Sequence, residues 1–194
     1  MRTTTRRRAV AVSALGVAAA SIALLIVVAQ ASPSTSLDDA PPVIGGDIDG
    51  ILPGGGASVD DGYPGVTHLD AQLRSALHDA ARDAAADGIR IAITSGWRSP
   101  DYQARLVREA VAQYGSEDEA ARWVASPATS LHVSGDAVDI GSYDAMEWLA
   151  EHGAAYGLCD VYENEPWHFE LRSDAPAAGC PPTYRDPTQD PRLQ

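Results

Sequence analysis

The sequence contains no lysine, and its positive side chains are 14 arginines. Four of these arginines lie in the first eight residues, where there is no Asp or Glu, so the remaining ten oppose all 27 acidic residues. A surface this acidic repels phosphate backbones and anionic membrane faces. The composition therefore argues against a nucleic-acid-binding protein. With 45% hydrophobic and 21% charged residues, it is otherwise typical of a globular protein.

Long apolar runs are scarce, and the one that stands out lies at the N-terminus. Residues 1–8 are basic, and residues 9–29 are apolar except for two serines. Ala29-Gln30-Ala31 fits a signal-peptide cleavage motif, but the run is also long enough to span a bilayer as a helix. We predict that residues 1–31 are a signal peptide or a membrane anchor. Either would place the rest of the chain outside the cytoplasm, secreted or held at the plasma membrane.

Cysteine is limited to two residues, Cys159 and Cys180. Neither has a second cysteine at CxxC spacing, which argues against the alternative of two zinc-ligating thiols. An even number of cysteines in an exported protein favours a disulfide. We therefore predict a Cys159–Cys180 bridge that ties the C-terminal part of the chain to the domain.

A change in composition marks the domain boundaries. Residues 32–65 are rich in Pro, Gly, Ser and Asp, which predicts a flexible linker. Residues 66–185 are predicted to form the folded domain, which is long enough to bury its own core. Residues 186–194 are assigned to a tail.

Periodicity within the domain predicts interspersed helices and strands. Four helices are expected: at 67–88, after Ser99, after Ser116 and at 142–152. Short strands are expected at 89–94, 137–140, 158–162 and 167–171, and a loop at 127–135. The regular alternation of a parallel α/β fold is missing. We predict an α+β fold, with a small, mainly antiparallel sheet packed with about four helices in a single domain.

Three polar residues in largely apolar surroundings suggest a metal site: His132, Asp139 and His168. Two imidazoles and one carboxylate are a ligand set of catalytic zinc, which keeps its fourth position open. Because Asp139 lies between Val138 and Ile140, a strand would place its carboxylate opposite two apolar neighbours. A carboxylate there needs a partner, which a metal ion supplies. We predict one zinc ion bound by these three residues.

Glu165 is the candidate general base and acid. It lies three residues before His168, and a bend at Pro166 would place it beside the metal without ligating it. A carboxylate there can take a proton from the attacking water and return it to the leaving amine. Arg98, which is permanently charged, is the candidate for stabilising the oxyanion. Candidate substrate contacts are Gln103 and Ser130.

Three motifs in this order resemble the zinc D-alanyl-D-alanine carboxypeptidase family of the VanY type. They are Ser95-Gly96-Trp97-Arg98-Ser99 with Gln103, S-x-H-x-x-G-x-A-x-D at 130–139, and Glu165-Pro166-Trp167-His168. The resemblance covers about residues 69–171. It implies the same zinc ligands, Glu165 as base and acid, and Arg98 as transition-state stabiliser, with Gln103 and Ser130 as substrate contacts.

The resemblance also implies a substrate class. We expect a metallocarboxypeptidase that removes the terminal D-alanine of peptidoglycan stem peptides. One alternative is an L,D-carboxypeptidase or wall endopeptidase with the same zinc site, and another is a non-catalytic wall-binding module. Glu165 favours an enzyme, because binding alone requires no base. We expect a monomer that contacts a membrane only through its N-terminal segment, if that segment is uncleaved.

Overall fold

The computed structural model describes residues 47–193, whose centre is a four-stranded antiparallel sheet in the order β1-β2-β4-β3. The strands are β1 (Ala92–Ser95), β2 (Ala137–Gly141), β3 (Leu158–Asp160) and β4 (His168–Leu171). Each strand lies within or close to a segment predicted to be extended. The α+β prediction with a small antiparallel sheet is therefore confirmed.

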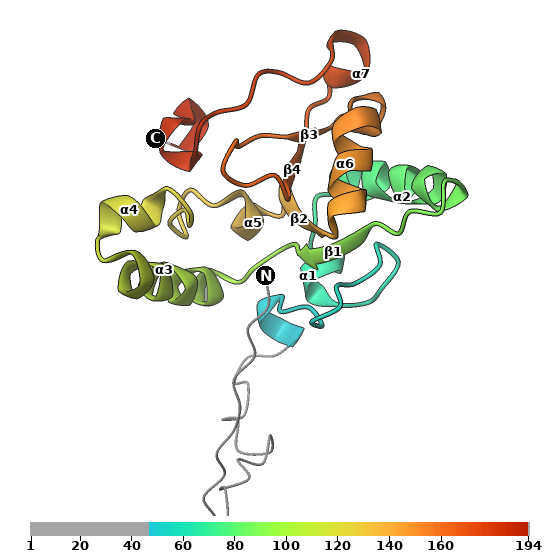
Figure 1. Ribbon diagram of the computed structural model, residues 1–194. Helices are drawn as coiled ribbons and strands as arrows, with labels where there is room; N and C mark the ends of the chain where they lie inside the picture. The colour runs from blue at the N-terminus through green and yellow to red at the C-terminus, as the bar shows by residue number, and fades with distance from the viewer. Residues whose placement is uncertain (1–46, 194) are drawn as a thin grey trace, which may run out of the picture. The chain divides into compact units, whose positions relative to one another are not determined.

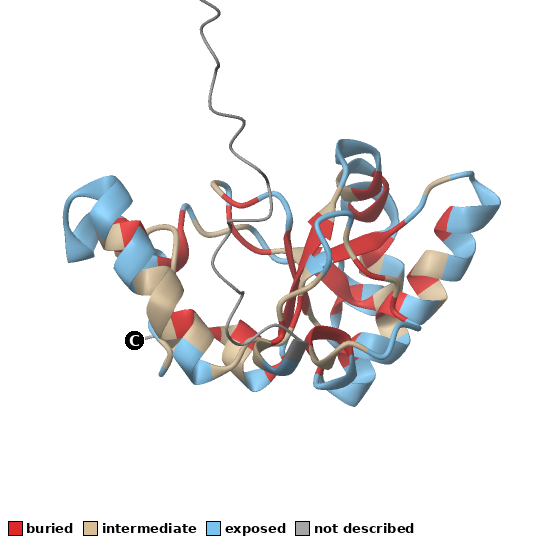
Figure 2. Ribbon diagram, turned by 90° about the horizontal axis from the view of Figure 1, so that it is seen from below, coloured by how far each residue is buried: buried red, intermediate tan, exposed pale blue. Residues whose placement is uncertain are grey.

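Two long helices cover one face of the sheet. Figure 1 shows α2 (Ala71–Ala86) and α6 (Tyr143–His152) together beside the strands. Leu73 and Leu77 of α2 join Val138 and Phe169 of the central strands in the buried core. Figure 2 shows buried residues concentrated in the sheet and exposed ones on the outer turns of the helices. The hydrophobic core of the domain therefore lies between this face of the sheet and the two helices.

A second pair of helices lies apart from the first. The pair α3 (Pro100–Tyr114) and α4 (Glu117–Ala121) pack together away from α2 and α6 (Figure 1). Ser99 and Ser116 cap them, because each hydroxyl accepts a backbone N–H three residues ahead, at 3.0 and 3.2 Å. The short helices are α1 (Pro64–Thr67), α5 (Leu131–Ser134) and α7 (Ala175–Ala178). The 3-10 turns are η2 (Asp47–Asp49), η3 (Gly153–Tyr156), η4 (Pro187–Gln189) and η5 (Pro191–Leu193).

Two local predictions need correction. The first long helix begins after Asp70 rather than at Thr67, because the Asp70 carboxylate accepts the N–H groups of Gln72 and Leu73 at 2.8 and 3.1 Å. Thr67 instead ends the separate short helix α1. The predicted loop at 127–135 contains helix α5, so His132 is presented by a helical turn.

Part of the predicted linker belongs to the folded domain. Ala57 and Val59 are buried in the core, and Ala57 exchanges backbone hydrogen bonds with Ile93 at 2.8 and 2.9 Å. Strand β1 is at the edge of the sheet, so its free backbone groups are available for this pairing. The Ser99 hydroxyl also donates to Asp49 at 2.7 Å. The folded domain therefore includes Asp49 and Ala57, ahead of the boundary predicted at residue 66.

The predicted disulfide is confirmed, since Cys159 in β3 is bonded to Cys180. Residues 186–193 also pack on the domain, because Asp186 and Asp190 are buried. The predicted signal peptide or anchor lies outside the described residues. Among residues 47–193, no helix combines the length and apolar character needed to cross a membrane.

The packing of α2 on the sheet predicts the effect of Leu73→Ala. This change should lower the free energy of unfolding by about 2–5 kcal/mol, because it leaves a cavity in a fully buried position. Arg74→Ala, at the next and exposed position, should change it by less than about 0.5 kcal/mol. Denaturant unfolding of both variants measures the difference. Equal effects would contradict the placement of the core.

Candidate metal centre and active site

The sheet register brings two of the predicted ligands together. Asp139 in β2 is the direct cross-strand partner of His168 in β4. Directly opposed residues in an antiparallel pair project from the same face, with Cβ atoms about 4.5–5.5 Å apart. Their neighbours Val138 and Phe169 form the adjacent pair and point into the core. The strands therefore carry a polar pair on one face and an apolar pair on the other.

His132 reaches the same point from helix α5. Gly135 ends this helix with a positive φ of 84°, and a Cβ there would lie 2.5 Å from the carbonyl oxygen of His68. The turn therefore requires glycine. Nδ1 of His132 lies 2.8 Å from the carbonyl oxygen of Gly96. Because that oxygen can only accept, Nδ1 carries the proton, and the lone pair of Nε2 is left for a metal.

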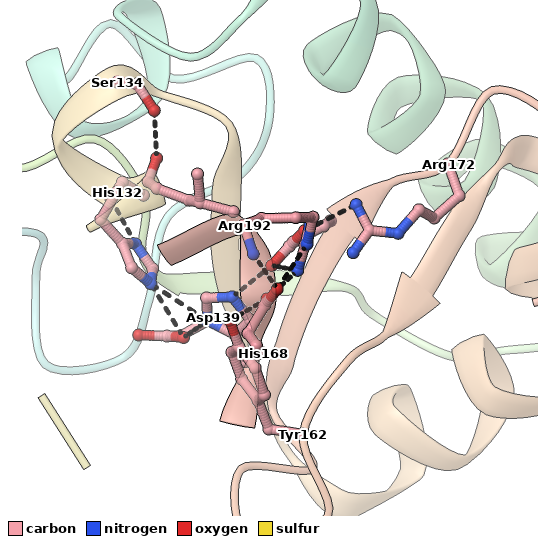
Figure 3. A network of polar contacts seen from close by, with 11 residues as sticks. His132, Ser134, Asp139, Tyr162, His168, Arg172 and Arg192 are labelled. Carbon is pink, nitrogen blue, oxygen red and sulfur yellow. Dashed lines mark hydrogen bonds and ion pairs between the residues drawn. The ribbon is translucent and has the colours of Figure 1, made fainter. Parts of the chain in front are cut away.

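The three donor atoms have the spacing of a tetrahedral metal site (Figure 3). Nε2 of His132 lies 3.2 Å from Nδ1 of His168, and both nitrogens lie 3.4 Å from Oδ1 of Asp139. Donors at 2.0–2.1 Å from a tetrahedral zinc ion are about 3.3 Å apart. Within the described part of the chain, Asp139 Oδ1 is buried without a hydrogen-bond partner. The donor set therefore fits an ion such as zinc, with one coordination position left open.

Each donor residue is oriented by a contact with a different group. The guanidinium of Arg98 donates to Oδ2 of Asp139 at 2.7 Å, which leaves Oδ1 facing the two imidazoles. Nε2 of His168 lies 3.3 Å from Oε1 of Glu170, so Nδ1 is the nitrogen that faces the centre. A carboxylate behind a ligating histidine is a recurrent feature of metal sites.

The charges of the donor residues follow from this arrangement. Burial alone would raise the pKa of Asp139, but His132, His168 and Arg98 hold it well below its usual range. Burial alone would lower the pKa of His168, but the carboxylates of Asp139 and Glu170 raise it to about 9. Burial and the charge of Arg98 lower the pKa of His132. Asp139 is thus anionic and His132 neutral, as metal ligands must be, and metal binding would displace a proton from His168.

Glu165 lies in the same cavity but outside the three-donor group. A turn positions Glu165. Its N–H donates to the carbonyl oxygen of Tyr162 at 3.2 Å, and its own carbonyl oxygen accepts from the N–H of His168 at 2.9 Å. Its Oε1 is buried and has no hydrogen-bond partner within residues 47–193. Burial raises the pKa of Glu165 to about 7. The side chain is therefore a buried carboxyl group near the metal position with a raised proton affinity.

Arg98 is fixed by its neighbours. Its Nε donates to Ser95 Oγ at 2.8 Å, and its Nη1 donates to Gln103 Oε1 at 3.1 Å. The amide nitrogen of Gln103 in turn donates to the carbonyl oxygen of Ala125 at 2.8 Å. Both ends of the Gln103 amide thus have protein partners, which makes it a support for Arg98. Its contact with substrate stays a prediction.

The cavity that contains these groups has a volume of about 300 Å³. Ser130, which precedes α5 without capping it, lines the cavity and is buried. Its role toward substrate stays a prediction. Sequence reasoning missed part of the wall, namely Leu106, Trp123, Pro187 and Leu193. Sequence reasoning also missed Glu170. Because Glu170 lies two residues after His168 in a predicted strand, both side chains are expected on one face, and this could have revealed its place beside the ligand.

Comparisons with known proteins agree with this geometry. Residues 66–173, more than half of the chain, match the VanY family of D-alanyl-D-alanine carboxypeptidases. The chain belongs to the VanY family. A relative, the D-alanyl-D-alanine carboxypeptidase of Enterococcus faecalis (strain ATCC 700802 / V583), is 31% identical over 126 residues. The match covers 52% of this chain and 47% of the relative, so the chain spans about half the length of that protein.

Two solved VanY structures share the fold. One is a mutant of the vancomycin resistance D,D-pentapeptidase VanY from a VanB-type cassette in complex with Zn(II). It is 30% identical with a TM-score of 0.50, and the match covers 53% of this chain and 72% of that one. The other is VanYB in complex with D-alanine-D-alanine, also 30% identical with a TM-score of 0.50, where 53% of this chain and 71% of that one are covered.

The donor geometry predicts stoichiometric metal binding by this VanY-family chain. We expect one zinc ion per chain, and His132→Ala should weaken zinc affinity by more than about 100-fold, because losing a ligand exceeds the 10–100-fold effect of losing an outer partner. Competition with a chelator of known affinity measures this. The control is His78→Ala, which changes an exposed histidine in helix α2. This variant should bind zinc like the wild type. Unchanged affinity in His132→Ala would contradict the assignment.

Proposed function

We propose that this protein is a zinc metallocarboxypeptidase that removes the terminal D-alanine of peptidoglycan stem peptides. The observation that carries the proposal is the buried Oε1 of Glu165, which has no hydrogen-bond partner within residues 47–193 and shares one cavity with three metal-donor atoms. The names of its relatives support it: one is a D-alanyl-D-alanine carboxypeptidase, and two VanY structures contain Zn(II) or D-alanine-D-alanine. The zinc ligands would be His132, Asp139 and His168.

The chemistry that zinc supplies when bound is Lewis acidity, which polarises the scissile carbonyl and makes a water molecule acidic near pH 7. Glu165 takes the proton of the attacking water on its carboxylate and returns it to the leaving amine. The free Oε1 suits this role, because no protein hydrogen bond within the described residues competes for it. A raised pKa of about 7 also suits a group that must both accept and release a proton at neutral pH.

Arg98 has two tasks in this proposal. It holds Oδ2 of Asp139, and it lines the cavity with a permanent positive charge. A fixed cation at the wall of a water-poor site stabilises the oxyanion that develops on the attacked carbonyl. Ser130 also lines the cavity, and its hydroxyl can hydrogen-bond the carboxylate of the terminal residue.

Two alternatives differ from the leading proposal in substrate or in chemistry. An L,D-carboxypeptidase or wall endopeptidase would use the same metal and the same base, so only substrate specificity separates it from the proposal. A non-catalytic wall-binding module would leave Glu165 unexplained, because a buried carboxyl oxygen without a partner, such as Oε1 within the described residues, destabilises the fold. The Glu165 environment therefore favours an enzyme.

We also propose that the domain works outside the cytoplasm. The basic and apolar residues 1–31 support export, and the Cys159–Cys180 disulfide suits an oxidising compartment. Cell fractionation followed by N-terminal sequencing tests this. It also separates cleavage after residue 31 from retention of the segment as an anchor.

The proposed mechanism predicts the effect of Glu165→Gln. With zinc bound, this variant should release D-alanine from a pentapeptide ending in D-alanyl-D-alanine about 100- to 10,000-fold more slowly than the wild type, because the base is lost. It should still bind one zinc ion, since Glu165 is outside the donor group. Glu163→Gln, at an exposed position two residues earlier, is the matched control and should be fully active.

Three results would overturn parts of this proposal. Equal activity of Glu165→Gln and the wild type would contradict the role of Glu165. Release of D-alanine from a tetrapeptide with an L,D bond, but not from the pentapeptide, would select the L,D-carboxypeptidase. A zinc-loaded wild type that binds stem peptides without cleaving any of them would select the wall-binding module.

A further inference from the structure

The C-terminal segment, residues 180–193, lies beyond the part of the chain that matches the family, yet it is fastened to the active-site side of the domain. It starts at the Cys159–Cys180 bridge. Backbone hydrogen bonds then join Tyr184 to Val161 and Glu163 at 2.8 and 2.9 Å. Figure 1 shows the red segment running from α7 back toward α4. Residues 186–193 of the tail assigned from sequence are therefore an ordered part of the domain.

Two buried aspartates anchor this segment. Asp186 accepts from Arg122, next to α4, at 3.1 Å. Asp190, which is 0% exposed, accepts from the hydroxyl of Tyr162 at 2.9 Å and from Nε of Arg192 on its other oxygen at 2.8 Å. Asp190 thus fixes the position of Arg192.

Arg192 in turn reaches Glu170, in the strand that carries His168. Its Nη1 donates to Oε2 of Glu170 at 2.7 Å, and its Nη2 lies 3.4 Å from Oε1. Arg172, the neighbour of strand β4, contacts the same Oε2 at 2.8 Å. Glu170 is 1% exposed, so these two guanidinium groups replace the water that an ionised carboxylate requires. Both arginines belong to the polar network around His168 in Figure 3.

Glu170 connects this cluster to the metal position. Its Oε1 lies 3.3 Å from Nε2 of His168, whose Nδ1 is one of the three metal donors. The orientation of the His168 ring therefore depends on where the Glu170 carboxylate is held. Arg172 holds only Oε2, whereas Arg192 approaches both oxygens and so fixes the rotation of the carboxylate.

We propose that Arg192 is a positioning residue for the metal centre: it orients Glu170, which orients His168 for metal binding. The inference rests on the proposed zinc site but concerns a residue outside the family match. Only two arginines follow residue 173 in the sequence, the exposed Arg185 and Arg192. Through Arg192, the inference assigns the C-terminal segment a function.

Zinc affinity of the folded protein tests the proposal without relying on activity. Arg192→Gln should weaken zinc binding by about 10- to 100-fold in chelator competition, as is typical when an outer partner of a metal ligand is lost. Arg192→Lys keeps the charge without the forked donor and should recover part of the affinity. The matched control is Arg185→Gln in the same segment, which should bind zinc like the wild type.

Asp190→Asn separates positioning from simple packing of the segment. It weakens the anchor of Arg192 but leaves the contact with Glu170 in place, so its zinc affinity should fall less than that of Arg192→Gln. Circular dichroism of each apoprotein confirms that the measurement starts from folded chains. If Arg192→Gln does not fold, Arg192→Lys must itself bind zinc more weakly than the wild type.

The outcomes distinguish this inference from the proposed function. Wild-type zinc affinity in folded Arg192→Gln, while the wild type binds zinc and cleaves its peptide, would overturn the positioning role alone. Equal losses in Asp190→Asn and Arg192→Gln would assign the effect to packing and also overturn it. A wild type that binds no zinc would overturn the proposed function and this inference together.

Discussion

Asp139 lies in a central strand with only 9% of its surface exposed, and its ionised carboxylate must be compensated inside the domain. Arg98 satisfies one oxygen at 2.7 Å, while the other faces His132 and His168 at 3.4 Å. Within the described residues this second oxygen has no hydrogen-bond partner, and a buried anionic oxygen is unfavourable unless a positive charge compensates it. The arrangement of the loop carrying Arg98, helix α5 and strand β4 around this carboxylate is therefore best explained by a metal ion.

The hydrophobic core and the metal site depend on the same strand register. Val138 pairs with Phe169 on the face covered by α2 and α6, and Asp139 pairs with His168 on the opposite face. A slip of either strand by one residue would turn its polar side chain toward the core and its apolar one out of it. The free energy gained by burying the apolar pair thus keeps the two metal ligands opposite each other. Core packing is in this sense a condition for metal binding.

Sequence reasoning succeeded where the signal was local and failed where it depended on distant contacts. The candidate ligands lie in short motifs, and alternation along β2 and β4 gives their faces. The cap at Asp70 was missed because Thr67 carries an equal local signal, and the backbone contact of Asp70 with Gly135 arises only in the fold. Ala57 was assigned to a linker because pairing with a strand edge requires no distinctive residue. Arg192 contacts Glu170 across 22 residues, and no periodicity marks that distance.

The three donor residues differ in the group that contacts and orients each of them, and these groups control the charge of the site. A neutral carbonyl supports His132, a carboxylate supports His168, and an arginine supports Asp139. An unneutralised second carboxylate near the metal would compete with the imidazole it supports, because carboxylate oxygen is itself a zinc ligand. Glu170 is prevented from doing so, since Arg172 and Arg192 both contact its Oε2 and compensate its charge. The two arginines therefore allow Glu170 to orient a ligand without becoming one, which keeps the donor set at two imidazoles and one carboxylate.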